Sequence, residues 1–481
     1  MGVGKFRQFH VAVACGFGSF LMSLINSWPS YTAEIYFSNT TTPLSAPMTK
    51  FEESLLGSLP SLGAMIGSLL PGLIVDRLGR RNGGVLLSLP VVISWAIVSV
   101  TTSMKMVLAA RFLGGVSGGA FLVIAPIFIS EVAEDSIRGT LASASMFLYC
   151  FGTLLSYVIG TFLTYHIIIW INVILSVTGT VLIALVTESP MFYLRQNREE
   201  DARFSIAKYR GVPVASVVVL DEISKLKQQV LPSVELVPIS ESQKSEKEAE
   251  EEKLKVEEEQ EKPQSTSAFK LLFLQPASRW ALTVVSIIIS MQVFMGCVCV
   301  QVYAKTVFMQ SDPSRADFYT IIFAFVLFSG TAVSGVITDK AGRRSLIIPS
   351  SALVFICMAG LGYLLHSNIA PPLVTVIMIF VYSFCFMLGA GTIPYVLLAE
   401  AFIPEVQSLA SMIVIELVWF TNFIIIALFP YMVDMFGIHG SFYCFSVIGL
   451  ANAIFSFFFV PETKGLSNAQ IQDAFLSRKK N

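Results

Sequence analysis

Residues 76–81 read DRLGRR, and residues 339–344 read DKAGRR. The first stretch lies in the first half of the 481-residue chain and the second in the second half. Each one follows a long apolar stretch and precedes another. A charged motif that recurs at matching places in two halves of a chain predicts an internal duplication.

The sequence around the two motifs is apolar. Hydrophobic residues make up 54% of the chain and charged residues 14%, with a mean hydropathy of +0.71. A soluble domain carries about a quarter charged residues, and a bilayer-spanning helix needs about 20 mostly apolar ones. The pattern therefore predicts an all-α membrane protein with twelve spans, six in each half. They are placed near residues 10–30, 55–75, 84–103, 107–130, 140–163, 167–187, 280–304, 316–338, 346–366, 372–399, 408–430 and 438–460.

A long polar region separates the two sets of spans. The predicted parts are an N-terminal six-helix bundle at 1–187, a cytoplasmic loop at 188–279, a C-terminal six-helix bundle at 280–463 and a cytoplasmic tail at 464–481. The loop contains a charged, low-complexity insert at 239–264. Such a segment cannot bury enough apolar surface to fold alone. We interpret it as a solvated linker, with a regulatory docking segment as the alternative.

The placement of Lys and Arg predicts that both termini are cytoplasmic. With the N-terminus inside, thirteen of these residues fall in short inner segments and four or five on the outer side. Asn39 begins the one N-x-S/T sequon, in the first outer loop. We therefore expect a multi-pass plasma-membrane protein that is glycosylated at Asn39, with an internal membrane as the alternative location.

Carboxylates recur at matched places in the two halves. Each even-numbered span has an acid at its predicted cytoplasmic end: Asp76, Glu131, Glu188, Asp339, Glu400 and Glu462. Guanidinium groups from nearby loops can form bidentate pairs with such acids. We expect these pairs at the seam between the halves, where they would hold the inner side shut while the outer side is open. Tight loops with inside-positive anchors are the alternative, which explains the arginines but not the matched acids.

The order and spacing of these motifs resemble the sugar porters of the major facilitator superfamily. The shared stretches are DRLGRR (76–81), RFLGG (111–115), EVAEDSIRG (131–139), ESP (188–190), DKAGRR (339–344), a Pro-Tyr…Ala-Glu stretch (394–400) and PETKG (461–465). The first span, with INSWPSYTAE (25–34), and the second are similar to the insect facilitated trehalose transporter branch of that family. The resemblance implies the major facilitator fold, with a central solute site at mid-membrane.

The resemblance also implies an inner salt-bridge network that gates the transporter. Its members here would be Asp76, Arg80, Arg81, Glu131, Arg138, Glu188, Asp339, Arg343, Arg344, Glu400 and Glu462. Two positions depart from the family pattern. Gln407 stands where an Arg is usual, and Met191 stands at the Arg of the family's ESPR.

The expected solute site departs further from the family pattern. On the seventh span, QVFMGCV (292–298) keeps Gln292 but has Val293 and Val298 in place of a Gln and an Asn. Tyr157 and Tyr395 take the positions of a Gln and a Trp. The site should therefore be more apolar or aromatic than a typical hexose site. The candidate solute-binding residues are Gln292, Asn422, Trp419, Tyr395, Tyr157 and Tyr303, each of which could instead serve helix packing.

Glu416 is an acid well inside the eleventh span. A charge in that position is a functional-site hypothesis by default. It could couple transport to protons, bind a cationic group, pair with a polar neighbour or lie nearer the membrane edge than the predicted span places it. The first span has no Asp or Glu between residues 10 and 33, and the resemblance implies that this favours facilitated diffusion.

Together these features predict a facilitative transporter of a sugar-like solute, trehalose or a hexose, that works by alternating access. A non-transporting solute sensor or receptor, and a transporter of a less polar solute, are the alternatives. The sequence has no arrangement of paired carboxylates, Cys and His, or Gly-rich phosphate loop that predicts an enzyme, a metal or a cofactor. The expected partners are the solute and the lipid bilayer. The net charge of −1 argues against nucleic acid, and no oligomeric state is predicted.

Overall fold

The computed structural model describes residues 3–134, 136–230, 268–367, 371–466 and 468–480. Within these ranges the regular structure is helical and no strand is present. The predicted charged insert at 239–264 lies outside the described residues.

The N-terminal half folds into one bundle of helices. They are α1 (Val3–Ser27), α2 (Pro29–Phe37), α3 (Lys50–Leu78), α4 (Arg80–Val100), α5 (Met104–Val132), α6 (Arg138–Phe162) and α7 (Tyr165–Ala184). Helix α5 packs against α1, α3 and α4, while α7 lies against α4 and α1. The six spans predicted for this half are present, and the first continues into α2.

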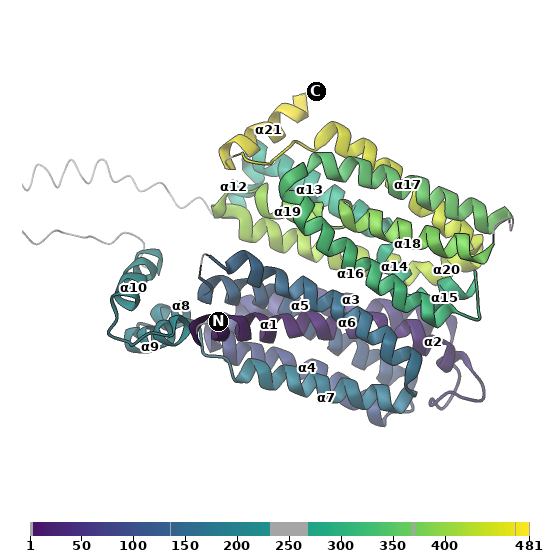
Figure 1. The fold of residues 1–481 in the computed structure, drawn as a ribbon, viewed down its shortest axis with the longest axis horizontal. Coiled ribbons are helices and arrows are strands. Elements are labelled where there is room, and N and C mark those ends of the chain that lie inside the picture. Colours follow the sequence, from purple (N-terminus) through teal and green to yellow (C-terminus); the bar gives the residue numbers. More distant parts are fainter. Residues whose placement is uncertain (1–2, 135, 231–267, 368–370, 467, 481) are drawn as a thin grey trace, which may run out of the picture.

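The C-terminal half forms a second bundle beside the first (Figure 1). Its helices are α13 (Pro276–Phe294), α14 (Cys297–Val302), α15 (Ala304–Met309), α16 (Ala316–Ala341), α17 (Arg344–Ser367), α18 (Pro372–Leu388), α19 (Ile393–Glu400) and α20 (Pro404–Phe459). Helix α20 is far longer than one bilayer crossing needs. At Gly437 its backbone is not helical, with φ 70° and ψ 169°, so α20 supplies the eleventh and twelfth spans. The prediction of twelve spans in two bundles is therefore confirmed.

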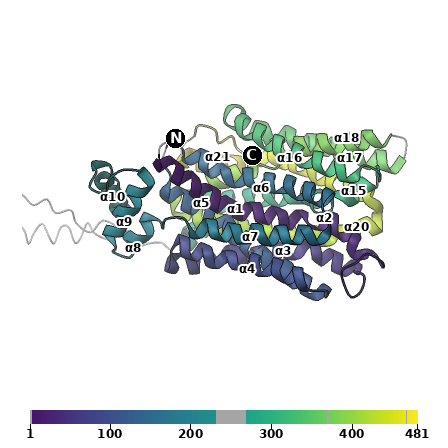
Figure 2. The same ribbon diagram turned by 60° about the horizontal axis from the view of Figure 1, so that its bottom comes forward.

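Short helices gather at one end of the molecule (Figures 1 and 2). They are α8 (Pro190–Arg195), α9 (Glu199–Arg210), α10 (Val217–Val230), α12 (Ala268–Leu274) and α21 (Asn468–Lys480). Both ends of the chain lie here as well (Figure 1). Because the two charged hexapeptides also lie at this end, we name it the motif end. The opposite end, which carries residues 38–49, is named the loop end.

Glycines allow α3 and α5 to approach closely. A Cβ atom at Gly115 would lie 2.1 Å from the backbone oxygen of Pro60, and one at Gly119 would lie 2.0 Å from that of Ala64. Small residues serve the same purpose in other packed membrane helices. This contact fixes α3 inside the bundle, so that its other face can meet the second bundle.

The two bundles meet along a seam. Helix α3 packs against α20 and α6 against α16, while α14 and α15 contact α1 and α2. Residues on these helices are therefore placed where the two halves of the duplication face each other.

Candidate functional site

The same ion pair forms in each bundle at the motif end. In the first, Arg80 donates from Nη2 to Glu131 Oε1 at 2.8 Å and from Nε to Oε2 at 2.9 Å. In the second, Arg343 donates from Nη2 to Glu400 Oε1 at 2.7 Å and from Nε to Oε2 at 3.2 Å. Such bidentate pairs fix the orientation of both side chains. The duplication seen in sequence is therefore also a duplication of geometry.

A second carboxylate in each half binds the backbone of the motif. The backbone N–H groups of Arg80 and Arg81 donate to Glu188, at 2.8 Å to Oε1 and 3.0 Å to Oε2. Glu462 accepts in the same way from the backbone of Arg343 and Arg344, at 2.8 and 3.1 Å. The carboxylates thus join the segment after the sixth and twelfth spans to the start of α4 and α17.

The motif glycines make this contact possible. Gly79 and Gly342 have φ values of 93° and 91°, a backbone conformation that favours glycine. A Cβ atom at Gly79 would lie 2.3 Å from Glu188 Oε2, and one at Gly342 would lie 2.7 Å from Glu462 Oε2. The Gly of each hexapeptide is therefore required both for the turn and for the approach of the carboxylate.

Glu188 is held in a buried position. Burial raises the pKa of its carboxyl group, while hydrogen bonds from the backbone of Ser189, Arg80 and Arg81 act in the opposite direction. A carboxylate whose oxygens accept hydrogen bonds from backbone N–H groups connects those chain segments. Few acceptor sites on it remain for a ligand. We therefore interpret Glu188 as a structural anchor.

Three further network residues lie near these pairs. Arg81 donates to the Ala184 carbonyl at 2.7 Å, and Arg344 donates to the Phe457 carbonyl at 2.7 Å. Asp76 lies 3.3 Å from Arg80 Nη1. The side chains of Arg138 and Asp339 are outside the described part of the structure.

At the two departures from the family pattern, the structure shows only local contacts. The amide of Gln407 donates to the Ala399 carbonyl at 3.0 Å. The backbone N–H of Met191 donates to Ser189 Oγ at 3.2 Å, which caps the start of α8. Neither contact reaches the other bundle.

The pairs that cross the seam lie at the loop end. Lys305 of α15 contacts Glu34 of α2 at 3.0 Å and Asp317 of its own bundle at 3.1 Å. Lys50 of α3 pairs with Asp434 of α20.

At the motif end, the ion pairs of the described residues stay within one bundle. Among the described residues, Arg80 and Arg343 pair with Glu131 and Glu400 of their own halves. A latch across the seam at this end stays a prediction, because the side chains of Arg138 and Asp339 lie outside the described part of the structure.

Electrostatics support the cross-seam pair at Lys305. Burial lowers the pKa of the Lys305 ammonium, but hydrogen bonds to Glu34 and Asp317 outweigh this effect and raise it overall. The ammonium is therefore charged at neutral pH, and its Coulomb attraction holds α15 against α2.

Glu416 also lies at the seam. Its carboxylate accepts a hydrogen bond from Ser68 of α3, which makes this a contact between the bundles. Of the roles considered for Glu416, the structure therefore shows the pairing with a polar neighbour. Ser68 can also donate to the Met65 carbonyl, at 2.9 Å, so its hydroxyl has two alternative acceptors.

Three predicted solute-binding side chains carry buried polar atoms that have no partner. Gln292 donates from Nε2 to the Gly391 carbonyl at 3.0 Å, but its Oε1 accepts nothing within the described structure. Asn422 Oδ1 and Trp419 Nε1 lack a partner in the same sense. A buried polar atom without a hydrogen bond is costly, and natural proteins leave few of them. The helices that carry these residues, α13 and α20, pack together.

The aromatic candidates lie in different environments. Tyr157 donates to the Gln301 carbonyl at 2.5 Å across the seam. Tyr303 lies 3.4 Å from the Ile426 carbonyl and stacks on Phe429 with ring centroids 5.3 Å apart. Tyr395, on α19, is 43% exposed. The hydroxyls of Tyr157 and Tyr303 are thus engaged in helix contacts in this conformation.

The structure places at the seam a polar group that was not predicted from the sequence. Gln301 of α14 donates to Thr153 Oγ1 at 3.2 Å and to the Tyr149 hydroxyl at 3.3 Å, both on α6. Asn26 of α1 donates to the same Tyr149 hydroxyl at 3.3 Å. Gln301 comes one helical turn after Val298, so a carboxamide is still present near the place where the family Asn is missing. Its polarity within an apolar span was the available signal.

Two bundles of six spans, related by repeated ion pairs and joined along a polar seam, define the transporter class of membrane proteins. Residues 10–475 match the family model described as "Sugar (and other) transporter". The chain therefore belongs to the sugar transporter family of the major facilitator superfamily.

Curated relatives and solved structures agree with this assignment. The facilitated trehalose transporter Tret1 of Drosophila mojavensis is 25% identical over 482 residues, which cover 98% of this chain and 52% of the relative. The Tret1 of Polypedilum vanderplanki is 26% identical over 483 residues, 98% of this chain and 89% of the relative. The chain thus spans about half the length of some relatives and most of others.

The solved structures confirm the fold. The inward-open xylose transporter XylE of E. coli matches with a TM-score of 0.74 and 20% identity, covering 98% of this chain and 99% of XylE. A D-xylose–proton symporter matches with a TM-score of 0.71 and 22% identity, covering 95% of this chain and 99% of the symporter.

Proposed function

We propose that the protein is a facilitative transporter of a sugar-like solute, with trehalose or a hexose as the leading candidates. The observation that carries this proposal is the set of buried polar atoms on Gln292, Asn422 and Trp419 that have no partner among the described residues. The names of the relatives, trehalose and xylose transporters, support the same solute class.

The chemistry of the three atoms suits a hydroxyl-rich solute. The amide oxygens of Gln292 and Asn422 accept hydrogen bonds, and the indole N–H of Trp419 donates one. A sugar hydroxyl both donates and accepts, so one solute can satisfy acceptors and a donor together. The apolar Val293 and Val298 favour a second candidate, a less polar solute that needs fewer hydrogen bonds.

Transport would proceed by alternating access around this site. In the present conformation the bundles are joined at the loop end by Lys305–Glu34 and Lys50–Asp434, and Ser54 donates to the Ala427 carbonyl at 2.7 Å. Opening this end requires that these contacts break. The ion pairs of the motif end can stay intact while each bundle moves as a body.

We further propose that the motif end faces the cytoplasm and that the protein resides in the plasma membrane. The excess of Lys and Arg in the short segments at the motif end supports the orientation, and exposed Asn39 in the segment between α2 and α3 is a suitable glycan acceptor on the outer side. We propose the same division of the chain as above, with bundles at 1–187 and 280–463. In this orientation the loop between them and the C-terminal tail are cytoplasmic.

Uptake into proteoliposomes tests the function. We expect saturable entry of labelled trehalose or a hexose that a proton uncoupler does not abolish. Gln292→Leu and Asn422→Leu should each raise KM about three- to tenfold, the effect of one lost hydrogen bond. Thr178→Val, on the lipid-exposed face of α7, is the control and should change nothing.

Two results would contradict the proposal. Uptake equal to that of protein-free liposomes for every sugar tested would exclude sugar transport. Full sensitivity to an uncoupler would exclude the facilitative mechanism while leaving the solute class intact.

A further inference from the structure

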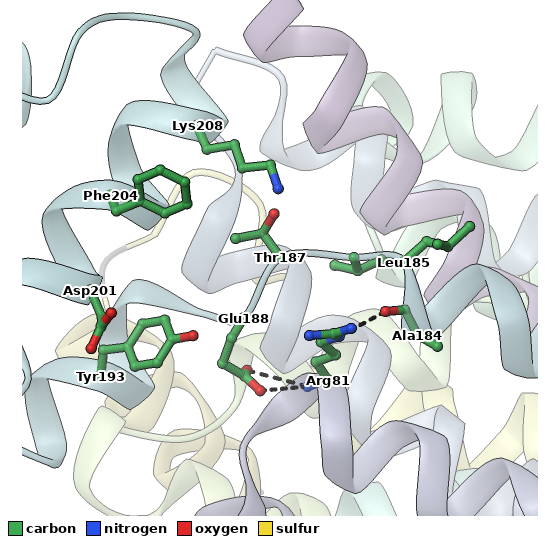
Figure 3. Close-up of a pocket in the computed structure, with 10 residues that line it drawn as sticks. Arg81, Ala184, Leu185, Thr187, Glu188, Tyr193, Asp201, Phe204 and Lys208 are labelled. Atoms are coloured by element: carbon green, nitrogen blue, oxygen red, sulfur yellow. Dashed lines mark hydrogen bonds between the residues drawn. The ribbon is translucent and has the colours of Figure 1, made fainter.

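A cavity of about 300 Å³ lies at the motif end, apart from the seam. It is located where the chain leaves α7, between Arg81 at the start of α4 and Lys208 of α9 (Figure 3). A second cavity of about 190 Å³ shares Lys208 and residues 185–187 with the first and adds Arg7 and His10 from α1. The transport mechanism uses neither cavity.

Hydrogen-bond donors that have no partner among the described residues line the larger cavity. Arg81 uses Nε on the Ala184 carbonyl, and its two terminal nitrogens donate to no group in the described part of the chain. The ammonium of Lys208 likewise forms no ion pair with an acid of the described residues, and it lies on the same side of the cavity as Thr187 (Figure 3). The cavity therefore presents two free cationic groups that reach it from different helices.

The two acids that line the cavity are engaged by other groups. Glu188 accepts from the backbone of Arg80, Arg81 and Ser189. Asp201 pairs with Arg198 at 2.8 Å. Both carboxylates are therefore already engaged. The lining has two cations and two acids, and the groups left to bind a ligand are the donors of Arg81 and Lys208. Guanidinium and ammonium groups bind phosphate oxygens through strong, charge-assisted hydrogen bonds.

The rim of the cavity is apolar. Leu185 and Phe204 both line it and are 66% and 59% exposed. Leu185 directly follows the membrane-spanning helix α7, so the cavity opens at the boundary of the hydrocarbon layer. A pocket that offers guanidinium and ammonium donors in this position suits an anionic phospholipid, whose headgroup enters the pocket while its acyl chains follow the helix.

We propose that this cavity binds a phosphate group, supplied by the headgroup of an anionic phospholipid. Lys208 and Arg81 hold the phosphate oxygens, and Leu185 and Phe204 contact the upper part of the acyl chains. A soluble phosphate ester shares the headgroup chemistry but lacks the contacts with the apolar rim. The site would let the lipid composition of the membrane act on α9 and on the start of α4.

The test uses the full-length protein in nanodiscs. Thermal unfolding is followed in phosphatidylcholine alone and with added phosphatidylinositol 4-phosphate, and in detergent with inositol 1,4-bisphosphate as the soluble arm. We expect the lipid to raise the unfolding temperature of the wild type. Lys208→Gln should weaken the apparent affinity about tenfold or more, which corresponds to one charge-assisted hydrogen bond.

A matched control separates a site from general surface charge. Arg77→Gln removes an exposed cation at the same end that lines neither cavity, and it should leave the response intact. Lys208→Arg should restore the response of the wild type, which shows that Lys208→Gln did not merely damage folding.

Each outcome decides the matter. An equal loss in Lys208→Gln and Arg77→Gln, or no response of the wild type in either arm, would overturn the proposal. A response to the soluble ester that equals the response to the lipid would uphold the phosphate site and reject the lipid as its source.

Discussion

The motif end and the loop end use ion pairs in different ways. At the motif end, the Arg80 side chain is 3% exposed and that of Glu131 11%, and the pair lies inside one bundle. At the loop end, the side chains of Lys50 and Asp434 are 43% and 51% exposed, and the pair joins two bundles. Removing one partner of a buried pair costs several kcal/mol, whereas exposed pairs contribute little.

This difference matches the demands of alternating access. A contact between bundles must break in every cycle, so it must be weak. A contact within a bundle must survive every cycle, so it can be strong. The motif arginines would therefore keep each bundle rigid, while the lysines of the loop end close it reversibly.

The largest effect is expected from the buried pair. Arg80→Ala leaves the Glu131 carboxylate without its partner and should destabilise the protein by about 3–5 kcal/mol. The unfolding free energy of purified protein measures this effect. Arg343→Ala should cost less, because Arg343 and Glu400 are 11% and 27% exposed and Thr463 donates a further hydrogen bond to Glu400 at 2.6 Å.

The exposed Arg77 of the same hexapeptide provides the control. Arg77→Ala should change stability by less than about 1 kcal/mol, since surface substitutions rarely do more. If Arg80→Ala behaved like Arg77→Ala, the contrast between a rigid motif end and a weak loop end would be lost.

Much of this architecture could be predicted from the sequence. Apolar length and the recurrence of acids at matched spacing identified twelve spans, two halves and the residues that form Arg80–Glu131 and Arg343–Glu400. These features are periodic and local, so they can be recognised in the amino-acid sequence. The side on which each arginine finds its acid is not local, because several acids lie within reach of each loop.

The solute site was harder to predict for a physical reason. Gln292, Trp419 and Asn422 could be proposed from motif positions, and they do carry unpartnered polar atoms. Gln301 was not predicted, because its partners Thr153 and Tyr149 come from the other half of the chain. Contacts across the seam depend on how the bundles dock, which the sequence does not express as a pattern.

The contact in the middle of the seam should have an intermediate effect. Ser68→Ala removes the hydrogen bond to the Glu416 carboxylate and should destabilise the closed loop end by about 1–3 kcal/mol. The population of that state can be measured from distances between spin labels at Phe51 and Met435, which are both exposed at the loop end.

A double-mutant cycle isolates this contact. In a Glu416→Ala background, Ser68→Ala should have almost no effect, because its partner is already absent. Equal effects in both backgrounds would mean that Ser68 acts through packing alone, and Glu416 would then be no part of the seam.

A smaller effect is expected at the loop end. Lys305→Gln breaks the contacts with Glu34 and Asp317, which are 57% and 45% exposed, and should shift the same equilibrium by about 1 kcal/mol or less. High salt should reproduce the shift in the wild type, since salt screens exposed pairs. Lys105→Gln, an exposed cation with no partner among the described residues, should leave the distances unchanged. If Lys305→Gln shifted the conformational equilibrium by as many kcal/mol as Arg80→Ala lowers the unfolding free energy, the distinction between the two ends would be lost.

The smallest effect on transport, and the one that assigns the two ends to the two sides of the membrane, concerns Asn39. In eukaryotic cells we expect glycosidase to change the electrophoretic mobility of the wild type but not of Asn39→Gln, with unchanged uptake in both, because the residue is exposed and outside the seam. Glu199→Thr creates a sequon at the exposed Asn197 of the motif end, and this site should stay unmodified. Modification of Asn197 instead of Asn39 would reverse the orientation, so that the weak cross-seam pairs would close the inner side and the rigid motif pairs would face outward.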